Sequence, residues 1–227
     1  MIKLTWLSHA SWLIETKTQK ILLDPFFAGN PKAQVSAADF HDATHVLVSH
    51  GHADHVADVE AVIKKSGAQL IASYEIAQHY QKNHGVENAI GMNLGGTFAM
   101  PDGTVKMVPA LHSSSFPDGT YAGEPAGFVL RSEDRRLYFA CDTAFFTDMK
   151  WYAGGSDVAI LPIGDLYTMG IHDSIEAVKL IEPRVVLPTH YDTWPPIEQD
   201  AAAWANKVHS ETDSKPVVLK VGETYQV

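Results

Sequence analysis

Short apolar runs recur along the chain, and several of them lead into segments with helical periodicity. Uninterrupted apolar runs are typical of strands buried on both faces, and we expect such strands at residues 20–23, 46–48, 69–72, 158–161 and 185–187. Apolar positions on one helix face, such as Val59, Val62 and Ile63, predict helices at residues 56–65, 74–83, 174–181 and 197–209. The alternation of strand and helix predicts βαβ units and an α/β class.

Mixed apolar and polar segments predict a second set of strands, at residues 1–6, 11–15, 96–100, 104–109, 128–131, 137–141 and 216–221. Asp102-Gly103 and Asp134-Arg135 have the composition of hairpin turns. Asp173 and Glu176 have the spacing of a capping box for the helix at 174–181. No linker or low-complexity tract interrupts the chain, so we expect a single domain over residues 1–227.

Composition narrows the class of protein. The apolar fraction is 45%, and no apolar run approaches the roughly 18 residues of a membrane span. The single cysteine, Cys141, excludes an internal disulfide, and no leader-like apolar stretch opens the sequence, so we expect a cytoplasmic protein without a membrane partner. The formal charge of -10 argues against nucleic acid as a partner, because a broad positive field is missing.

The segment His50-Gly51-His52-Ala53-Asp54-His55 follows the apolar run at 46–48 and is dense in metal-binding side chains. Alternate residues of an extended segment point the same way, so His50 and His52 can reach one metal. Asp54 and His55 lie where the chain turns into a helix, and they suit a second metal. Imidazole and carboxylate are ligands for zinc, iron or manganese. A solvated histidine-rich turn is the alternative, but it would not need an apolar strand before it.

This His-x-His-x-Asp-His pattern after a buried strand resembles the metallo-β-lactamase superfamily. The resemblance implies a four-layer αββα sandwich, with two sheets face to face, helices outside and metals at one edge. It also implies a histidine, an acidic residue and a second histidine, each directly after a later strand. His112, Asp142 and His190 occupy such positions.

The resemblance divides these residues between two divalent metals. It implies one set formed by His50, His52 and His112, a second set formed by Asp54, His55 and His190, and a bridge formed by Asp142. Zinc is the first expectation, with manganese, iron and nickel as alternatives. Other interpretations stay open for three of the residues. His112 would then be a loop histidine, Asp142 the N-cap of a turn and His190 a cap on a strand end.

Asp24, at the end of the strand at 20–23, matches an aspartate that the superfamily carries near its metals. We expect it to orient a ligand histidine, and a plain Asp-Pro turn is the alternative. Cys141 neighbours Asp142, but strand alternation points its thiol the other way, so we expect a core residue and not a ligand.

A closer resemblance is to a branch of metal-dependent hydrolases of unknown substrate, related to the ascorbate-6-phosphate lactonases. It is carried by residues 6–11, 142–144, 161–164, 168–170 and 190–196. The chain departs from the branch at Gly164-Asp165-Leu166-Tyr167, where the branch has a second glycine followed by an aromatic residue. His172 is another departure, either a surface residue or a substrate contact. Related lactonases assemble, so the resemblance implies a homo-oligomer.

The activity implied is hydrolysis of a small-molecule ester, lactone or phosphoester by a hydroxide held between two divalent metals. Asp54 and Asp142 would orient the hydroxide, and His9 is a candidate electrophile or proton donor, with a structural role as the alternative. We expect the substrate pocket to include Ser113, Tyr167, Thr168, Met169 and Trp194.

The sequence is also compared with three alternative functions. A nucleic-acid phosphodiesterase is disfavoured by the acidic charge. A redox di-iron protein is disfavoured by His52, because those relatives have glutamate there. A metal-binding protein without catalysis would keep the same ligands, and only activity separates it from a hydrolase.

Overall fold

Strand alternation sorts the apolar side chains onto two faces of each sheet. In the computed structural model, which describes residues 1–227, Ile21 and Leu23 of β3 (Lys20–Leu23) belong to the large core that both sheets share. Leu22 between them belongs to a second core, formed with the helices on the outer face. Strands buried on both faces need apolar residues at every buried position, which is why the three residues after Lys20 in β3 are all apolar.

The two sheets have seven strands each and share one plan. The first has the order β14 (Thr224–Gln226), β1 (Lys3–Trp6), β2 (Trp12–Glu15), β3, β4 (His45–Leu47), β5 (Gln69–Ser73) and β6 (Ala89–Met92). The second has the order β13 (Lys215–Pro216), β12 (Val185–Thr189), β11 (Val158–Pro162), β10 (Arg135–Phe139), β9 (Ala126–Ser132), β8 (Gly103–Pro109) and β7 (Thr97–Met100). In each sheet, four strands at one side are parallel and the others are antiparallel.

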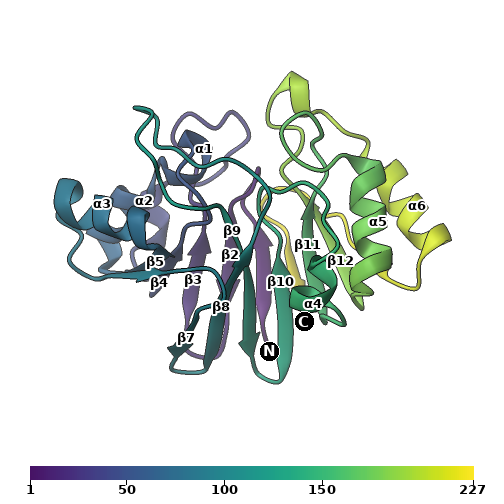
Figure 1. The fold of residues 1–227 in the computed structure, drawn as a ribbon, viewed down its shortest axis with the longest axis horizontal. Coiled ribbons are helices and arrows are strands. Elements are labelled where there is room, and N and C mark those ends of the chain that lie inside the picture. Colours follow the sequence, from purple (N-terminus) through teal and green to yellow (C-terminus); the bar gives the residue numbers. More distant parts are fainter.

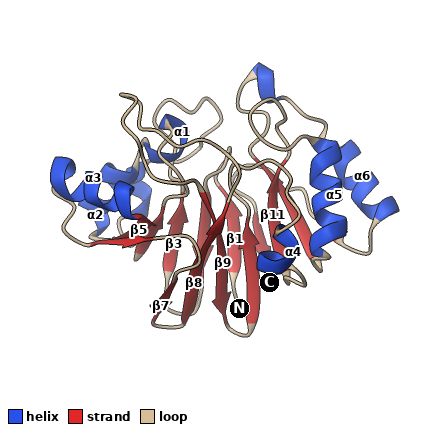
Figure 2. Ribbon diagram, viewed as in Figure 1, coloured by secondary structure: helices blue, strands red, loops and turns tan.

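Helices cover the outer faces of both sheets (Figure 2). The helices α2 (Val59–Ser66) and α3 (Tyr74–His84) pack on the first sheet, and α4 (Met149–Ala153), α5 (Ile171–Ile181) and α6 (Ala201–Glu211) pack on the second. Shorter elements are α1 (Ala53–Val56) and the 3-10 turns η1 (Ala37–Phe40) and η2 (Pro195–Ile197). The layers confirm the expected αββα sandwich. No helix combines the length and apolar character that a membrane crossing requires.

Among the strands whose carboxyl ends lie at one edge of the sandwich are the six that precede the candidate site residues. Strands β1, β3 and β4 run in one direction within the first sheet, and β8, β10 and β12 share a direction within the second. In Figure 1, α1, which follows β4, lies at the upper edge, and both chain termini lie toward the lower one. Side chains that follow these six strands therefore gather where open α/β sheets carry their sites.

Several predicted elements differ from the structure. The helix expected at 56–65 corresponds to α2, which begins at Val59, because Val56 ends the separate α1. The helix expected from residue 197 begins at Ala201 after η2. The capping box prediction is wrong, because α5 begins at Ile171 with Gly170 as its N-cap, which leaves Asp173 inside the first turn. The strand expected at 216–221 is also wrong, because the chain pairs only at β13 and again at β14. The prediction missed β6, β14 and α4.

We expect Trp204→Ala to lower the free energy of unfolding by about 3–5 kcal/mol, measured by chemical denaturation. Trp204 of α6 is fully buried, and its indole N–H donates a 3.1 Å hydrogen bond to Ser174 Oγ of α5. The matched control is Trp151→Ala on α4, where the side chain is 81% exposed. Equal losses in the two variants would contradict this account of how the outer helices are held.

Candidate metal centre

The segment 50–55 carries four metal-binding side chains from the end of β4 into α1. His50 follows the strand, His52 is the N-cap residue of α1, and Asp54 and His55 lie within the helix. His50 and His55 are fully buried, whereas His52 and Asp54 are partly exposed. The ring nitrogens His50 Nε2 and His52 Nδ1 are 2.9 Å apart, so these two side chains converge as the alternation predicted.

Gly51 packs against the loop at 112–124. A Cβ at Gly51 would lie 2.4 Å from the Cβ of Ala122 and 3.1 Å from the backbone of Ser115. The glycine therefore lets this loop lie directly on the donor segment. The loop carries His112 at its start, so this close packing brings His112 toward His50 and His52, whose rings lie 5.0 and 5.1 Å from its own.

The carboxylate of Asp142 lies at the centre of the donor cluster. Its Oδ2 atom is 3.1 Å from His190 Nε2, 3.3 Å from His55 Nε2, 3.7 Å from His112 Nε2 and 3.9 Å from His50 Nε2. Asp142 follows β10 and is 3% exposed. One oxygen atom thus stands among histidines that come from both sheets.

The donor atoms fall into three overlapping groups, each with its atoms within 4.8 Å of one another. The groups are His50, His52 and His112; His9, Asp54, His55 and His190; and His50, His55 and Asp142. The first two correspond to the two sets expected from the sequence, with His9 added to the second. The third group joins Asp142 to one histidine from each set, as a shared ligand requires.

Asp24 orients His55. The carboxylate is fully buried and accepts hydrogen bonds from the Ser49 backbone N–H at 2.8 Å, the Ser49 hydroxyl at 2.6 Å and His55 Nδ1 at 2.9 Å. The Nδ1–H bond fixes the tautomer of His55 and leaves Nε2 facing Asp142. The contacts support the expected orienting role, since a plain Asp-Pro turn would need none of them.

His9 holds Asp54 and does not face the cavity. Its ring is 0% exposed, with Nε2 3.0 Å from Asp54 Oδ2 and Nδ1 2.8 Å from Thr193 Oγ1. Burial, with His190 nearby, lowers the pKa of His9 to about 4, so the ring is neutral near pH 7. Its Nε2–H then donates to Asp54 while Nδ1 accepts from Thr193. Both ring nitrogens of His9 are occupied, which favours the structural role over the donation of a proton to substrate.

The buried histidines and the Asp142 carboxylate shift one another's pKa values. Burial disfavours the charged form of His55, but the Asp142 and Asp24 carboxylates outweigh it and raise the pKa of His55 well above its usual value. Burial likewise opposes ionisation of Asp142, but His190 and His55 hold the pKa of that carboxyl well below its usual range. Burial and His55 lower the pKa of His50. The site therefore requires positive charge beside Asp142.

The donor chemistry fits a divalent metal. His55 Nε2, Asp142 Oδ1 and His190 Nδ1 are buried without a hydrogen-bond partner. Such atoms are rare in folded proteins, because an unmet buried polar group costs free energy. A cation between imidazole nitrogen and carboxylate oxygen would satisfy His55 Nε2 and neutralise Asp142. Nitrogen and oxygen donors in this number suit zinc, manganese or iron.

A cavity of about 690 Å³ opens beside the cluster. It is lined by Phe26, Ala28, His52, Ala53, Asp54, Ala57, His112, Asp142, Tyr167, His190 and Trp194. Of the expected pocket residues, Tyr167 and Trp194 line it. Sequence reasoning missed Phe26, Ala28 and Ala57, which no motif marks, although Phe26 lies two residues beyond Asp24.

The other three expected pocket residues do not line the cavity. Met169 is 1% exposed and lies in the hydrophobic core, so its assignment to the pocket is wrong. Thr168 donates its hydroxyl to the backbone oxygen of Met169. Ser113 is exposed, with its hydroxyl 3.4 Å from His52 Nε2, so it lies beside the donor cluster but outside the cavity wall. His172 is exposed on the first turn of α5, which supports its interpretation as a surface residue.

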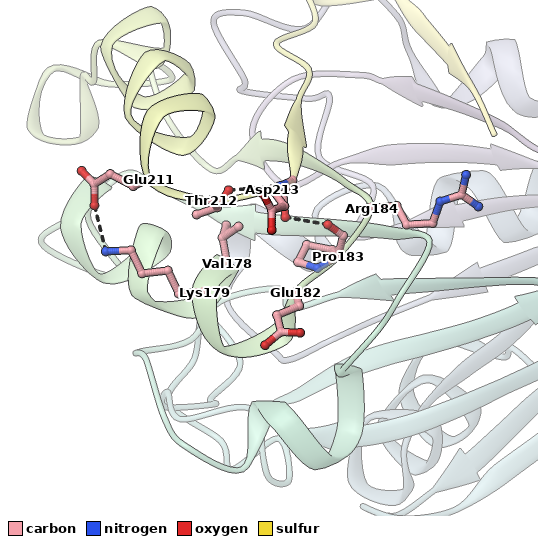
Figure 3. A pocket seen from close by; sticks show the side chains of 9 residues that line it. Val178, Lys179, Glu182, Pro183, Arg184, Glu211, Thr212 and Asp213 are labelled. Carbon is pink, nitrogen blue, oxygen red and sulfur yellow. Dashed lines mark hydrogen bonds and ion pairs between the residues drawn. The ribbon is translucent and has the colours of Figure 1, made fainter.

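A separate cleft of about 450 Å³ lies at the carboxyl ends of α5 and α6 (Figure 3). It is lined by Val178, Lys179, Glu182, Pro183, Arg184, Glu211, Thr212, Asp213 and Ser214. Lys179 is paired with Glu211 across it at 2.8 Å. The cleft lies where β12 begins, whereas His190 follows the end of that strand. It holds no histidine and lies away from the donor cluster.

Known proteins with similar sequences and structures span the whole chain. A UPF0173 metal-dependent hydrolase of Thermus thermophilus is 42% identical over 100% of both chains. Another, of Enterococcus faecalis, is 46% identical over 91% of each chain. The solved structure of Igni18, a metallo hydrolase from Ignicoccus hospitalis, is 32% identical, with a TM-score of 0.88 over 100% of this chain and 99% of that one.

The two-sheet sandwich and the histidine–aspartate cluster at its edge define a metal-dependent hydrolase of the metallo-β-lactamase fold. The sequence profile of the beta-lactamase superfamily domain matches residues 19–191. The chain belongs to that superfamily and, within it, to the UPF0173 metal-dependent hydrolases.

We expect Asp24→Asn to weaken metal affinity by about 10–100-fold, measured by competition with a chromogenic chelator, because partners that orient a ligand histidine contribute this much. The amide has one acceptor oxygen in place of two, so it cannot hold His55 and Ser49 together as the carboxylate does. Asp39→Asn, at an exposed carboxylate on η1, is the control. Unchanged affinity in Asp24→Asn would show that Asp24 only shapes the turn.

Proposed function

We propose that the protein hydrolyses a small ester, lactone or phosphoester at a centre where Asp142 is shared by two divalent metals. The observation that carries this proposal is the position of Asp142 Oδ2, within 4.0 Å of histidine nitrogens from both expected ligand sets. A carboxylate that served one ion would not need donors on both sides. The sharing therefore supports a binuclear centre over a mononuclear one.

The residues that would hold the metals are those of the donor cluster. They are His50, His52 and His112 on one side, Asp54, His55 and His190 on the other, and Asp142 between them. When bound, divalent metals lower the pKa of water to about 7 and polarise the oxygen of the scissile bond. Zinc is the first candidate, and the same donors accept manganese, iron or nickel.

The side chain of Asp54 can orient the attacking water. Asp54 is 25% exposed in its side chain and lines the cavity, while His9 fixes its Oδ2 atom from behind. A carboxylate so held can accept a hydrogen bond from an attacking water and set its direction toward the substrate. No serine or cysteine lines the cavity, which supports direct attack by water over a nucleophilic side chain.

Two alternatives are less well supported. A nucleic-acid phosphodiesterase needs a basic surface along the polymer, but the formal charge is -10 and no lysine or arginine lines the cavity. A metal-binding protein without catalysis would need no substrate-sized cavity beside its ligands. The volume of about 690 Å³ lies within the range of small-molecule sites, about 300–1,000 Å³.

We expect Asp142→Ala to retain one metal per chain in place of two and to lose about 100-fold or more in hydrolysis, because the shared ligand is gone. Metal content by mass spectrometry and the rate on a p-nitrophenyl substrate panel measure the two effects. Asp142→Asn, which keeps the side-chain shape, tests whether the loss reflects misfolding, and the exposed Asp118→Ala is the control. An unchanged metal count and rate would exclude the shared-ligand centre.

Chelation should abolish hydrolysis, and zinc should restore it. Metal binds the folded chain through residues from both sheets, so its removal should also lower the melting temperature. The decrease in melting temperature should be larger for a metal that binds more tightly. Calorimetry with and without chelator measures this shift, with circular dichroism as a check on folding. Full activity in protein shown to be free of metal would overturn the proposal.

A further inference from the structure

The cavity wall is apolar except for the donor cluster itself. Its non-donor residues are alanines and aromatic residues: Ala28, Ala53, Ala57, Phe26, Tyr167 and Trp194. The charged side chains in the wall are Asp54 and Asp142, both candidate ligands. No lysine or arginine is present. A phosphate on a substrate, away from the metals, would therefore find no cationic side chain to pair with.

One part of this wall is a packed aromatic cluster. The Phe26 and Trp194 rings have centroids 5.9 Å apart, and both pack on the ring of His9, at 5.6 and 5.0 Å. Since His9 bonds to Asp54, this aromatic surface directly adjoins the carboxylate that faces the reaction. Tyr167 adds a further aromatic side chain that is 56% exposed.

Burial of a charged group without a partner costs much more than burial of apolar surface gains. Proteins that bind phosphate supply arginine, lysine or helix N-termini for it. Aromatic walls instead bind aryl and alkyl groups, with about 0.8 kcal/mol gained for each buried methylene group. The wall therefore discriminates against a second anionic group and favours an apolar one.

We propose, on the basis of the hydrolase function proposed above, that the substrate is a neutral carboxylic ester or lactone with an aryl or alkyl group bound by Phe26, Tyr167 and Trp194. Water adds to the acyl carbon, the bond from that carbon to the alcohol oxygen breaks, and the alcohol oxygen takes a proton. The other proton of the water is released to solvent, so the products are a carboxylate and an alcohol, or one hydroxy carboxylate from a lactone. Phosphorylated lactones and phosphodiesters are poor substrates of this cavity.

The test uses zinc-loaded protein with three probes: 4-nitrophenyl acetate, 4-nitrophenyl hexanoate and bis(4-nitrophenyl) phosphate. We expect kcat/KM for the hexanoate to exceed that for the acetate by about tenfold or more, because the longer chain buries more apolar surface. The phosphodiester should be hydrolysed more slowly than either ester. Trp194→Ala should lower kcat/KM for the hexanoate about tenfold more than it lowers kcat/KM for the acetate, because the longer chain loses more apolar contact. The control is Trp151→Ala, far more exposed on α4.

A binding measurement separates recognition from catalysis. The neutral amide 4-phenylbutanamide cannot be turned over readily, and calorimetry or saturation-transfer NMR can follow it on metal-free protein. We expect it to bind wild type and Trp151→Ala alike, and Trp194→Ala about tenfold more weakly. A binding defect shared by both variants would show that the aromatic wall is not the binding surface.

The outcomes separate a failure of the proposed substrate class from a failure of the proposed hydrolase function. If the zinc-loaded protein hydrolyses the phosphodiester faster than both esters, or the acetate as fast as the hexanoate, the substrate class proposed here is wrong and the hydrolase function stands. If no probe is hydrolysed above the rate of metal-free protein, and lactones also fail, the hydrolase function itself fails.

Discussion

A buried carboxylate must have positive charge close to it, and the arrangement of this fold follows from that constraint at Asp142. The group is 3% exposed, and the atoms nearest to its Oδ2 include imidazole nitrogens contributed by both sheets. No lysine or arginine approaches within ion-pair distance of it. A proton on His55 or a metal cation can neutralise it, and both need the strand ends of the two sheets to be held in register.

The positions of these strand ends depend on residues with positive φ. Residues other than glycine seldom adopt this backbone conformation. His9, Asp24, Cys141 and His190 all have positive φ, at 52°, 45°, 55° and 54°. Each such turn costs on the order of 1–3 kcal/mol and redirects the chain directly after a strand. The carbonyl of His9 accepts hydrogen bonds from the Trp6 indole, the Thr189 hydroxyl and the His190 N–H. These bonds join the end of β1 to the end of β12, so hydrogen bonding between the sheets offsets the strain at the site.

The sequence predicts the donor cluster well because it is encoded locally. A buried strand followed by alternating histidines marks residues 50–55, and a strand end marks each of Asp142 and His190. The residues of the cavity wall are not marked by any local sequence pattern. Phe26 and Trp194 meet only because Asp24 and His190 turn the chain sharply, and no periodicity records such turns. The start of α5 was misjudged for a related reason: an extended Gly170 ends the preceding loop and outweighs the capping tendency of Asp173.

Trp194 and Tyr167, two aromatic residues of the cavity wall, differ in whether their substitution would disturb the candidate metal ligands. Trp194 packs on His9, which bonds to Asp54, so a change of ring at this position also changes the support of a candidate ligand. Tyr167 stands on a different loop, after Asp165 and Leu166, which both have positive φ where a glycine would be unstrained. That loop is exposed and carries no member of the donor cluster. Substrate preference can therefore vary at Tyr167 with the metal ligands intact, whereas variation at Trp194 acts on binding and on Asp54 together.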